Sequence, residues 1–561
     1  MPANIIAIDT EWFQMEGRLH RPGGIFACLS TTDGLGVQTS GASPLLFVDK
    51  PTTKKYLSTL KKEFDGVLAI QNAEFDIRQL RHLGLWPEGW TPNLLDTMIV
   101  EQDLFGGWYQ SFSLAAMSRR WLNTYLPKDT VSSFRDGKIL TATQSKYALK
   151  DAKSTRGIAE KQIEYVEDEY GGDFNWYWEI DLPAMWATLD MPPIRMDVPG
   201  WLAYAQQLRE EGDAIQEKLG FNVKSQPQVQ EALRGTGLRI RADGSCDQNA
   251  LVGWLQEARN TGNKKRAKFL EQIMRARHCR DAFSKYGNKW VAENVEDNEW
   301  VYPNWKVTGA ETGRMACSDP NMMNIPKRGE DSVYRSFFVA SPGNTLLVAD
   351  VQQQEPRFSA YLSKDETLRQ EIMEGIDLHQ VHADMFGTDR PTGKKINLSL
   401  NYLISAYSLA TQTGMPVEEI EEGIRQRRMH YPMYYSWMDR QQRFAEKNNY
   451  VTTVTGRRIW TNPYNFQAIR NAVNGPIQGS SADQTKLALR YVWEECLAGS
   501  LPFAVIMVVH DEMVLDIPKK MAPKYKKIVN DAFQEAGKQL MPSIPTVIEF
   551  RTGNTWRADV E

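Results

Sequence analysis

The segment VIMVVHDEMVLDI, residues 505–517, constrains the fold of this chain more than any other stretch. Apolar and β-branched residues fill both halves of the segment, which is typical of buried strands. His510, Asp511 and Glu512 interrupt the apolar run, and a buried carboxylate is costly unless cations or donors compensate it. The segment therefore predicts two strands of a sheet with acids at their junction. It also indicates a metal site whose other ligands lie elsewhere in the chain.

Length and composition place the chain among ordered globular proteins. Its 561 residues are enough for several domains, and 42% of them are hydrophobic and 11% aromatic, which excludes a disordered chain. The N-terminus lacks the pattern of a signal peptide, and no apolar run reaches the roughly 18 residues of a membrane span. Five scattered cysteines without a CxxC pair favour a reducing compartment over a disulfide framework or a zinc ribbon. We therefore expect a soluble intracellular protein without a membrane partner.

The order of strand and helix patterns predicts a multidomain α/β and α+β chain. The strand NIIAIDTEW opens an alternation of strands and helices, and a helical region follows at about 200–290. The strand NTLLVADVQQ and a long helical stretch at about 365–448 then precede the late strand pair. We expect helices to be inserted between strands of a single late sheet.

The net charge of −4 hides a basic region between Arg259 and Lys289. This region contains ten basic and two acidic residues, a local charge of +8. On predicted helices such a patch is a plausible footprint for a phosphate backbone, although a solvated helical face explains it equally well. If the patch does bind DNA, the residues expected to contact it are Lys264, Lys265, Arg266 and Lys268.

A first group of carboxylates lies in the N-terminal third. Asp9 and Glu11 are two apart on a predicted strand, so both point to the same face. Asp76 and Asp151 each follow a polar residue by four positions, which places each pair on one helical face. Those polar residues are Asn72 and Tyr147. Four carboxylates and a tyrosine can hold two divalent ions about 4 Å apart and orient a water against a phosphodiester.

The segments DTE, NAEFD and YALKD, in this order, resemble the three motifs of the proofreading 3'–5' exonucleases with an RNase H-like fold. The resemblance implies that Asp9, Glu11, Asp76 and Asp151 are metal ligands. It also implies that Tyr147 positions the attacking water, and that single-stranded 3' ends are the substrate.

A second group lies in the C-terminal two thirds. LLVADVQQQEPR places Asp350 at the end of an apolar strand, and Asp511 ends another, so two strands can deliver a second two-metal site. RPTGKKINLSLNYL contains four residues at steps of four: Arg390, Lys394, Leu398 and Tyr402. Such residues share one broad helical face. Two cations followed by an aromatic suit a triphosphate with a base stacked beyond it.

Two other patterns in this region are weaker. GTDRPTGKK is similar to a P-loop, but five residues rather than four separate the glycines, and Lys395 replaces the required Ser or Thr. His379 and His382 stand at i and i+3, but no third metal-ligand pattern surrounds them. For His379 we expect a phosphate contact or simple packing.

The motifs of the whole chain resemble those of the family A DNA polymerases, which have a Klenow-like architecture. This resemblance implies an RNase H-like exonuclease domain at 1–180 and a right-hand polymerase domain at 181–561. The polymerase domain is expected to divide into a thumb at about 200–290, a palm at about 300–364 and 450–561, and fingers at about 365–449.

The resemblance also implies roles for single residues. DVQQQEPR resembles the first polymerase motif, with Asp350 as metal ligand and Glu355 as the gate that rejects a ribose 2'-OH. VHDE resembles the last motif, with Asp511 as second ligand and with Glu512 and His510 in support. TGRMACSDPNMMNIP and RNAVNGPIQGSSAD resemble the segments that contact primer–template DNA. The DNA contacts they imply are Arg314, Asn321, Asn324, Arg470, Asn474 and Gln478, with His510 beside them.

RPTGKKINLSLNYL resembles the fingers helix, which gives Arg390 and Lys394 to the incoming triphosphate and Tyr402 to the base-pair pocket. The full set of expected nucleotide contacts is Arg390, Lys394, Leu398, Tyr402, Glu355, His379 and Gln354. Magnesium, with an octahedral shell of oxygens, is the expected cofactor, two ions per active site, and Mn²⁺ can substitute. The expected partners are primer–template DNA and dNTPs, bound by a monomer.

Some residues depart from the family pattern. Leu398 stands where an aromatic residue is usual, and Leu403 replaces the glycine that usually follows Tyr402. Gln352 and Gln354 stand where Ser and Ile are common. Ordinary divergence explains these departures, and so does a pocket for a modified base such as 2-aminoadenine, which some phage family A polymerases copy.

The apparent lack of a 5' nuclease domain and the short thumb lead us to expect a bacteriophage replication enzyme that acts in the cytoplasm of an infected bacterium. Three other functions stay open. A single-subunit RNA polymerase is disfavoured by Glu355 and by the exonuclease motifs. A 3'–5' exonuclease with a C-terminal module that binds DNA without polymerising is the second, and a non-catalytic DNA-binding protein is the third.

Overall fold

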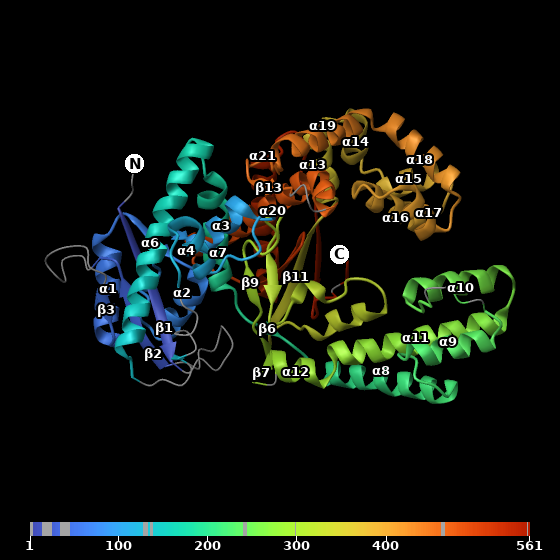
Figure 1. Ribbon diagram of the computed structural model, residues 1–561, viewed down its shortest axis with the longest axis horizontal. Helices are drawn as coiled ribbons and strands as arrows, with labels where there is room; N and C mark the ends of the chain where they lie inside the picture. The colour runs from blue at the N-terminus through green and yellow to red at the C-terminus, as the bar shows by residue number, and fades with distance from the viewer. Residues whose placement is uncertain are drawn as a thin grey trace.

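The computed structural model describes residues 4–13, 25–33, 45–126, 133–134, 139–238, 240, 244–297, 299–461, 466–557 and 559–560, without the side chains of 466–470 and 559–560. Four parts are visible in Figure 1. The N-terminal domain lies at one end of the molecule and the central sheet in the middle. The helical arm (α8 to α11) and the helical lobe (α14 to α19) project from the central sheet on the side away from the N-terminal domain.

The N-terminal domain is built on a five-stranded sheet of order β3-β2-β1-β4-β5. β1 pairs antiparallel with β2 and parallel with β4, and its apolar run makes it the central strand. The strands are β1 (Ile5–Phe13), β2 (Ile25–Thr31), β3 (Leu45–Phe47), β4 (Val67–Ile70) and β5 (Leu94–Asp96). The helices are α1 (Lys50–Glu63), α2 (Ala73–His82), α3 (Thr97–Phe105), α4 (Leu114–Leu122) and α6 (Ala142–Tyr170), followed by η1 (Trp176–Asp181) and α7 (Leu182–Asp190).

The helical arm is an antiparallel pair of long helices with two shorter ones at its tip. The pair is close because Gly212 lies against Cys279, where an added Cβ would come within 2.9 Å of the Cys279 Cβ. The helices are α8 (Val198–Leu219), α9 (Gln226–Gly235), α10 (Gln248–Asn260) and α11 (Lys264–Tyr286). At the base of the arm lie α12 (Asn288–Asn294) and the short strands β6 (Ile194–Arg195), β7 (Val295–Glu296), β8 (Trp300–Val301), β9 (Asn304–Lys306) and β10 (Ala316–Ser318).

The central sheet has the order β14-β15-β11-β16-β17 and contains the hairpin expected from VIMVVHDEMVLDI. β14 and β15 pair antiparallel around a two-residue turn, His510–Asp511, so this prediction is confirmed. The strands are β11 (Asn344–Val351), β14 (Val505–Val509), β15 (Glu512–Pro518), β16 (Ile548–Gly553) and β17 (Asp559–Val560). The helices of this part are α13 (Gln354–Ser363), α20 (Phe466–Ala498) and α21 (Ala522–Leu540), with η2 (Met322–Asn324), η3 (Glu330–Phe337) and η4 (Lys519–Met521).

The helical lobe is inserted between strands of the central sheet, as the sequence predicts. Its helices are α14 (Glu366–Met373), α15 (Leu378–Met385), α16 (Arg390–Asn401), α17 (Ala406–Thr413), α18 (Val417–His430) and α19 (Pro432–Asn448). A hairpin of β12 (Tyr450–Thr452) and β13 (Arg458–Trp460) leads from the lobe back to α20. None of the described helices combines the length and the apolar character that crossing a membrane requires.

A buried charge cluster joins the N-terminal domain to α20. Arg457, with a side chain only 2% exposed, donates to Asp103 of α3, to Asp181 at 2.7 Å and to Asp483 of α20 at 2.9 Å. Lys486 of α20 also contacts Asp181. Burial opposes ionisation of Asp181, but Arg457 and Lys486 outweigh it and lower the pKa of this carboxyl below its usual value. Ionic contacts between segments distant in sequence therefore hold the two domains together.

We expect Arg457→Met to destabilise the protein by about 3–5 kcal/mol, because it strands buried carboxylates without their cation. Arg425→Met is the matched control, since Arg425 forms an exposed pair with Glu422 that contributes little. Urea unfolding of both variants measures the difference. Equal unfolding midpoints for the two variants would show that the cluster does not hold the domains together.

Candidate functional site

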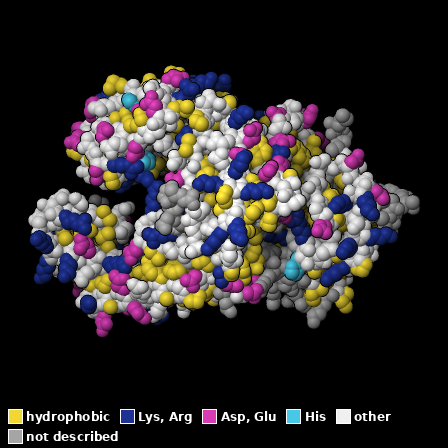
Figure 2. Space-filling view, turned by 180° about the vertical axis from the view of Figure 1, so that it is seen from behind, with side chains coloured by type: hydrophobic (Ala, Val, Ile, Leu, Met, Phe, Trp, Pro, Cys, Tyr) yellow, Lys and Arg dark blue, Asp and Glu magenta, His cyan; other side chains and the backbone are white. Residues whose placement is uncertain are grey.

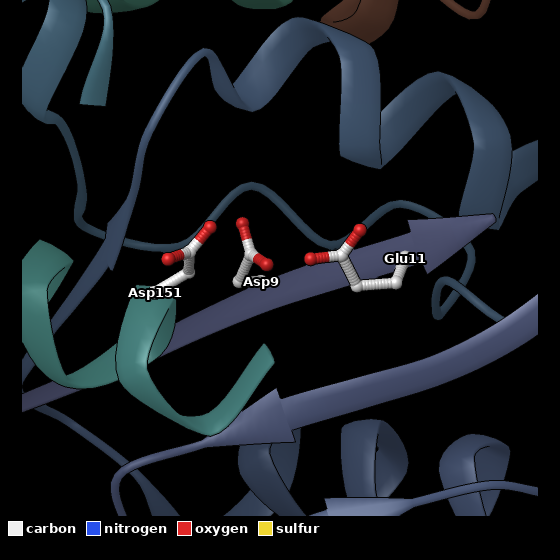
Figure 3. A group of neighbouring side chains, drawn as sticks. All are labelled: Asp9, Glu11 and Asp151. Carbon is white, nitrogen blue, oxygen red and sulfur yellow. The ribbon is translucent and has the colours of Figure 1, made fainter. Parts of the chain in front are cut away.

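Three carboxylates converge on the face of the N-terminal sheet. Asp9 and Glu11 lie on β1 and Asp151 lies on α6, and each offers an oxygen within 4.8 Å of the others. Figure 3 shows Asp9 between the other two side chains. The alternation of the strand turns Asp9 and Glu11 to this face, while Thr10 and Trp12 are buried. The structure thus brings together three of the four carboxylates expected here.

The electrostatics of this group favour a bound cation. Burial, followed by the neighbouring carboxylates, raises the pKa of Glu11 to about 8, and the same causes raise the pKa of Asp9. Burial raises the pKa of Asp151 to about 7, and a hydrogen bond from Tyr147 opposes this rise. Asp151 Oδ1 is buried and has no hydrogen-bond partner among the described residues. A divalent cation would satisfy this oxygen and relieve the repulsion, so the residues fit a metal site.

Asp76, the fourth expected ligand, lies close enough to Asp9 and Glu11 for its charge to raise the pKa of both. Its Oδ1 accepts hydrogen bonds from the Thr10 backbone N–H at 3.1 Å and from the Thr10 hydroxyl, so the carboxylate is directed at the backbone of β1. Burial nevertheless raises its pKa to about 7, and Asp76 in turn raises the pKa of Asp9, which it therefore neighbours. Asn72 lies in the left-handed conformation (φ 59°) before α2 begins, so the predicted Asn72–Asp76 pair on one helical face is wrong.

Sequence analysis missed Asp96, which orients α2. Its two carboxylate oxygens accept from the backbone N–H groups of Asn72 at 3.0 Å and Ala73 at 2.7 Å. It also caps α3 through Met98 and Ile99. The sequence LLDT, an apolar strand that ends in Asp before a helical pattern, is the N-cap signal that could have revealed it.

A second cluster of carboxylates lies where two neighbouring strands of the central sheet, β11 and β15, meet at their ends. Asp350 of β11 pairs in register with Glu512 of β15, and Asp511 lies in the turn before Glu512. Burial, followed by the charge of Asp350, raises the pKa of Asp511 to about 6, so the two aspartates lie close enough to interact. His510 adopts φ 59°, a conformation that a non-glycine residue rarely takes and that often marks a functional turn. The arrangement fits a divalent cation between two carboxylates.

Several cations that sequence analysis missed surround Glu512, whose side chain is 1% exposed. Arg335 Nη1 lies 3.0 Å from one carboxylate oxygen, and Arg551 Nη2 lies 3.1 Å from the other. Lys327 contacts Asp350 directly and lies 3.3 Å from Glu512. Despite its burial, these cations lower the pKa of Glu512, so it stays ionised. The sequence signal for Lys327 is the basic pair Lys327–Arg328 after NIP, but nothing in the sequence assigns a partner to it or singles out the two arginines.

The helix α16 presents the expected cationic face. Gly393 allows α16 to pack against α15, since an added Cβ would lie 2.5 Å from the Ala383 backbone nitrogen. Arg390 at the first turn pairs with Asp377. Lys394 is half-buried, and burial together with neighbouring Arg328 and Arg390 lowers its pKa.

The last residues of the RPTGKKINLSLNYL segment lie beyond this helix or are exposed on it. Tyr402 comes after the end of α16, so only three of the four predicted residues share its helical face. Its hydroxyl accepts a hydrogen bond from Gln478 Nε2 at 2.8 Å. Leu398 is 46% exposed. Leu403 has φ 54°, a left-handed conformation that favours glycine.

Three further residues were expected to contact the nucleotide, and the structure places them in different surroundings. Glu355 accepts from Arg314 and lies close enough to Tyr402 that, after burial, its charge raises the pKa of Tyr402. His379 is half-buried, and burial followed by the charge of Lys394 lowers its pKa, which favours the neutral imidazole. The prediction for Gln354 is wrong. Its side chain is 5% exposed and its Nε2 donates to Gln484 Oε1 at 2.9 Å and to the backbone oxygen of Ser481, so it packs against α20.

The residues expected to contact DNA differ in their exposure and in their hydrogen bonds. Asn474 is buried, and its Nδ2 has no hydrogen-bond partner among the described residues, which leaves a donor for a ligand. The Asn321 side chain instead caps η2 by accepting from the Met323 backbone N–H, and Asn324 is exposed. The side chain of Arg470 lies outside the described residues.

The basic region of the helical arm is less uniform than its charge count indicates. Lys264, Lys265 and Lys268 are exposed near the tip, whereas Arg266 donates to the Thr236 backbone oxygen. Three arginines of α11 bind partners on neighbouring segments, so fewer side chains of this region are left to contact a phosphate backbone than the charge count indicates. These arginines are Arg275, Arg277 and Arg280. Figure 2 shows an open cleft between the arm and the lobe, with Lys and Arg side chains along its margin.

Comparison with known proteins connects these features to a family. A family model described as DNA polymerase family A matches residues 202–558, and a model described as 3'-5' exonuclease matches residues 2–162. The POL domain of Pol1 from M. smegmatis, solved in complex with DNA primer-template and dNTP, has a similar fold, with a TM-score of 0.80 and 22% identity. The match covers 99% of this chain and 95% of that one.

Bacterial relatives agree with the family models. DNA polymerase I of Aquifex aeolicus is 25% identical over 531 residues, and the match covers 87% of each chain. DNA polymerase I of Caldicellulosiruptor bescii is 34% identical over 273 residues, 46% of this chain and 32% of that protein. The thermostable enzyme of Thermus filiformis is 27% identical over 68% of this chain and 48% of its own length. The chain thus spans about a third to a half of the length of the last two relatives. With the family model matched over more than half of its residues, this chain belongs to the family A DNA polymerases.

Proposed function

We propose that the protein synthesises DNA from dNTPs on a primed template and removes nucleotides from single-stranded 3' ends at a separate site. The observation that carries this proposal is that one family A chain has two clusters of carboxylate side chains, one on each of two different sheets. In this proposal the central sheet is the palm, the helical lobe is the fingers and the helical arm is the thumb. The cleft of Figure 2 then receives the primer–template duplex.

At the synthetic site, Mg²⁺, or Mn²⁺ in its place, would lower the pKa of the primer 3'-OH and neutralise charge on the pyrophosphate, with two ions as the expected number. Asp350, at the end of β11, and Asp511, in the turn between β14 and β15, would hold the cations. Arg390 and Lys394 orient the triphosphate from α16 and stabilise the charge that develops on it. Tyr402, steadied by Gln478, offers a face to the nascent base pair.

At the trimming site, bound divalent ions would activate a water molecule and stabilise the leaving 3' oxygen. Asp9, Glu11 and Asp151 supply the converging oxygens. Tyr147, which interacts with Asp151, would orient the water. Asp76 contributes indirectly in the described geometry, because its hydrogen bonds to Thr10 fix the strand between Asp9 and Glu11.

The pKa values predict how metal binding at the trimming site depends on pH. The folded protein holds protons on Glu11, Asp76 and Asp151 up to pKa values of about 7–8, well above those of unfolded carboxyls. These groups therefore destabilise the metal-free fold as pH rises through that range, and metal binding releases the protons. We expect Mn²⁺ affinity at this site to increase from pH 6 to pH 8.5. Calorimetry on an Asp350→Asn background, which removes the other site, measures it, and a flat profile would contradict the assignment.

The proposed activities are tested by extending a labelled primer on a template with Mg²⁺ and all four dNTPs, and by following 3' trimming of the same primer without dNTPs. We expect both reactions, and we expect EDTA to abolish them. A primer that neither grows nor shortens with either metal would reject the proposal. Extension without a primer would favour an RNA polymerase instead.

A preference for 2-aminoadenine is a finer proposal. Leu398 on the exposed face of α16 supports it, whereas Gln354 no longer does because its side chain is buried. Competition between dATP and 2-aminoadenine triphosphate measures the preference, and equal incorporation would end the proposal. A bacteriophage origin, the cytoplasm of an infected bacterium and a monomeric state stay predictions; the relatives compared above are bacterial.

A further inference from the structure

Lys327 stands out among the cations around the synthetic site because it contacts the metal-binding side chain itself. Its Nζ contacts Asp350 Oδ2 and lies 3.3 Å from Glu512 Oε2. The chain segment that carries it follows η2, and the Lys327 side chain is 41% exposed, compared with 19% for Asp350. A single ammonium group thus bridges two of the three acids at the strand ends.

The other two cations near Glu512, Arg335 and Arg551, are held in place by further contacts. Arg335 is 6% exposed, donates to the Pro326 and Ile325 backbone oxygens and stacks 3.8 Å above the Trp556 ring. Arg551 is 15% exposed and divides its contacts between Glu512, Glu549 and, at 3.8 Å, Asp350. Both are fixed in the wall of the site. Lys327 instead ends a flexible four-carbon stem, and an ammonium is a compact charge that exchanges partners readily.

Lys327 also lies close enough to Lys394, the expected triphosphate contact on α16, for the two charges to interact. Its charge helps to lower the pKa of Lys394 on α16, after burial and the nearer Arg328 and Arg390. Lys327 therefore lies between a group of carboxylates and a group of cations. Triphosphate oxygens held by Lys394 would give the Lys327 ammonium a second set of anionic partners within its reach.

We propose that Lys327 is a resident cation that competes with the divalent ion for Asp350 when no nucleotide is bound and moves to the triphosphate when one is. This inference rests on the proposed synthetic function. Its consequence is that metal and nucleotide bind cooperatively. The nucleotide draws Lys327 away from Asp350, which frees this carboxylate for the metal, and the metal releases Lys327 to contact the triphosphate. Lys327 acts on the metal through Asp350 and is in that respect a positioning residue.

Two binding measurements on Lys327→Met test the proposal, and we expect the affinity for Mn²⁺ to rise and the affinity for dATP to fall. The full chain carries Asp9→Ala and Glu11→Ala, so that Mn²⁺ binds only at the synthetic site. With no nucleotide, Lys327→Met should bind Mn²⁺ roughly tenfold more tightly, because an adjacent positive charge has been removed. With Mn²⁺ saturating, the same variant should bind dATP several-fold more weakly, because a charge-assisted contact to phosphate is lost.

Lys520→Met is the matched control, since Lys520 is exposed on η4 and loses the same charge. It should match the parent in both titrations, and Lys327→Arg should keep dATP binding near that of the parent. A misfolded variant would weaken both ligands, so tighter Mn²⁺ with weaker dATP excludes that explanation. Unchanged Mn²⁺ affinity in Lys327→Met overturns the proposal. If Asp350→Asn also leaves Mn²⁺ binding unchanged, the synthetic site itself has been misplaced and the proposed function falls with it.

Discussion

Asp350→Asn is expected to lower primer extension by a factor on the order of a thousand while 3' trimming proceeds at the wild-type rate. The substitution keeps the size of the side chain and removes its charge, so the strand is not disturbed. β11 pairs with β15 on one side and β16 on the other, which fixes the backbone at this position. The lost rate therefore reports the missing ligand and not a displaced strand.

Asp516→Asn provides the matched control on the same sheet. Asp516 lies further along β15, in register with Leu346, and accepts from the Ser341 backbone N–H, so it takes no part in the site. Single-turnover incorporation of one dNTP by both variants separates chemistry from DNA release. Wild-type incorporation by Asp350→Asn would show that synthesis does not need this carboxylate and would refute its assignment to the ends of these two strands.

The positions of several carboxylates within their own strands could be predicted, because they depend only on the alternation of residues along a strand. Alternation along β1 places Asp9 and Glu11 on one face, and the apolar halves of the late hairpin leave Asp511 at its turn. The error at Gln354 has a local cause as well. α13 begins at Gln354, so this side chain turns toward α20 while the next residue, Glu355, turns toward the cleft.

The contacts around Glu512 could not be predicted in this way. Arg335 is 177 positions away and Arg551 is 39 positions away, and both reach Glu512 only through the packing and register of the central sheet. The basic region of the arm shows the same limit. A count of charges along α11 cannot reveal that Arg275 is paired with Glu211 on α8.

The double substitution Asp9→Ala with Glu11→Ala is expected to reduce 3' trimming at least about a thousandfold and to leave primer extension intact. It removes two of the three converging carboxylates, and Asp151 alone cannot hold a divalent ion in place. The central sheet is a separate unit, so its carboxylates keep their geometry. Release of labelled mononucleotide from a single-stranded 3' end measures trimming. Loss of extension in the same variant would contradict the independence of the two sites.

The same variant has a second expected property that follows from electrostatics alone. Because burial and mutual repulsion raise the pKa of Asp9 and Glu11, the metal-free fold loses stability as pH rises from the ordinary carboxyl range to the value of about 8 for Glu11. In EDTA the double variant should therefore unfold at a higher temperature than the wild type at pH 9, and the difference should shrink toward pH 6. Adding Mg²⁺ should stabilise the wild type more than the variant. A metal site of this kind lowers the stability of the protein when no metal is bound. A double variant less stable than the wild type at pH 9 in EDTA would contradict this account.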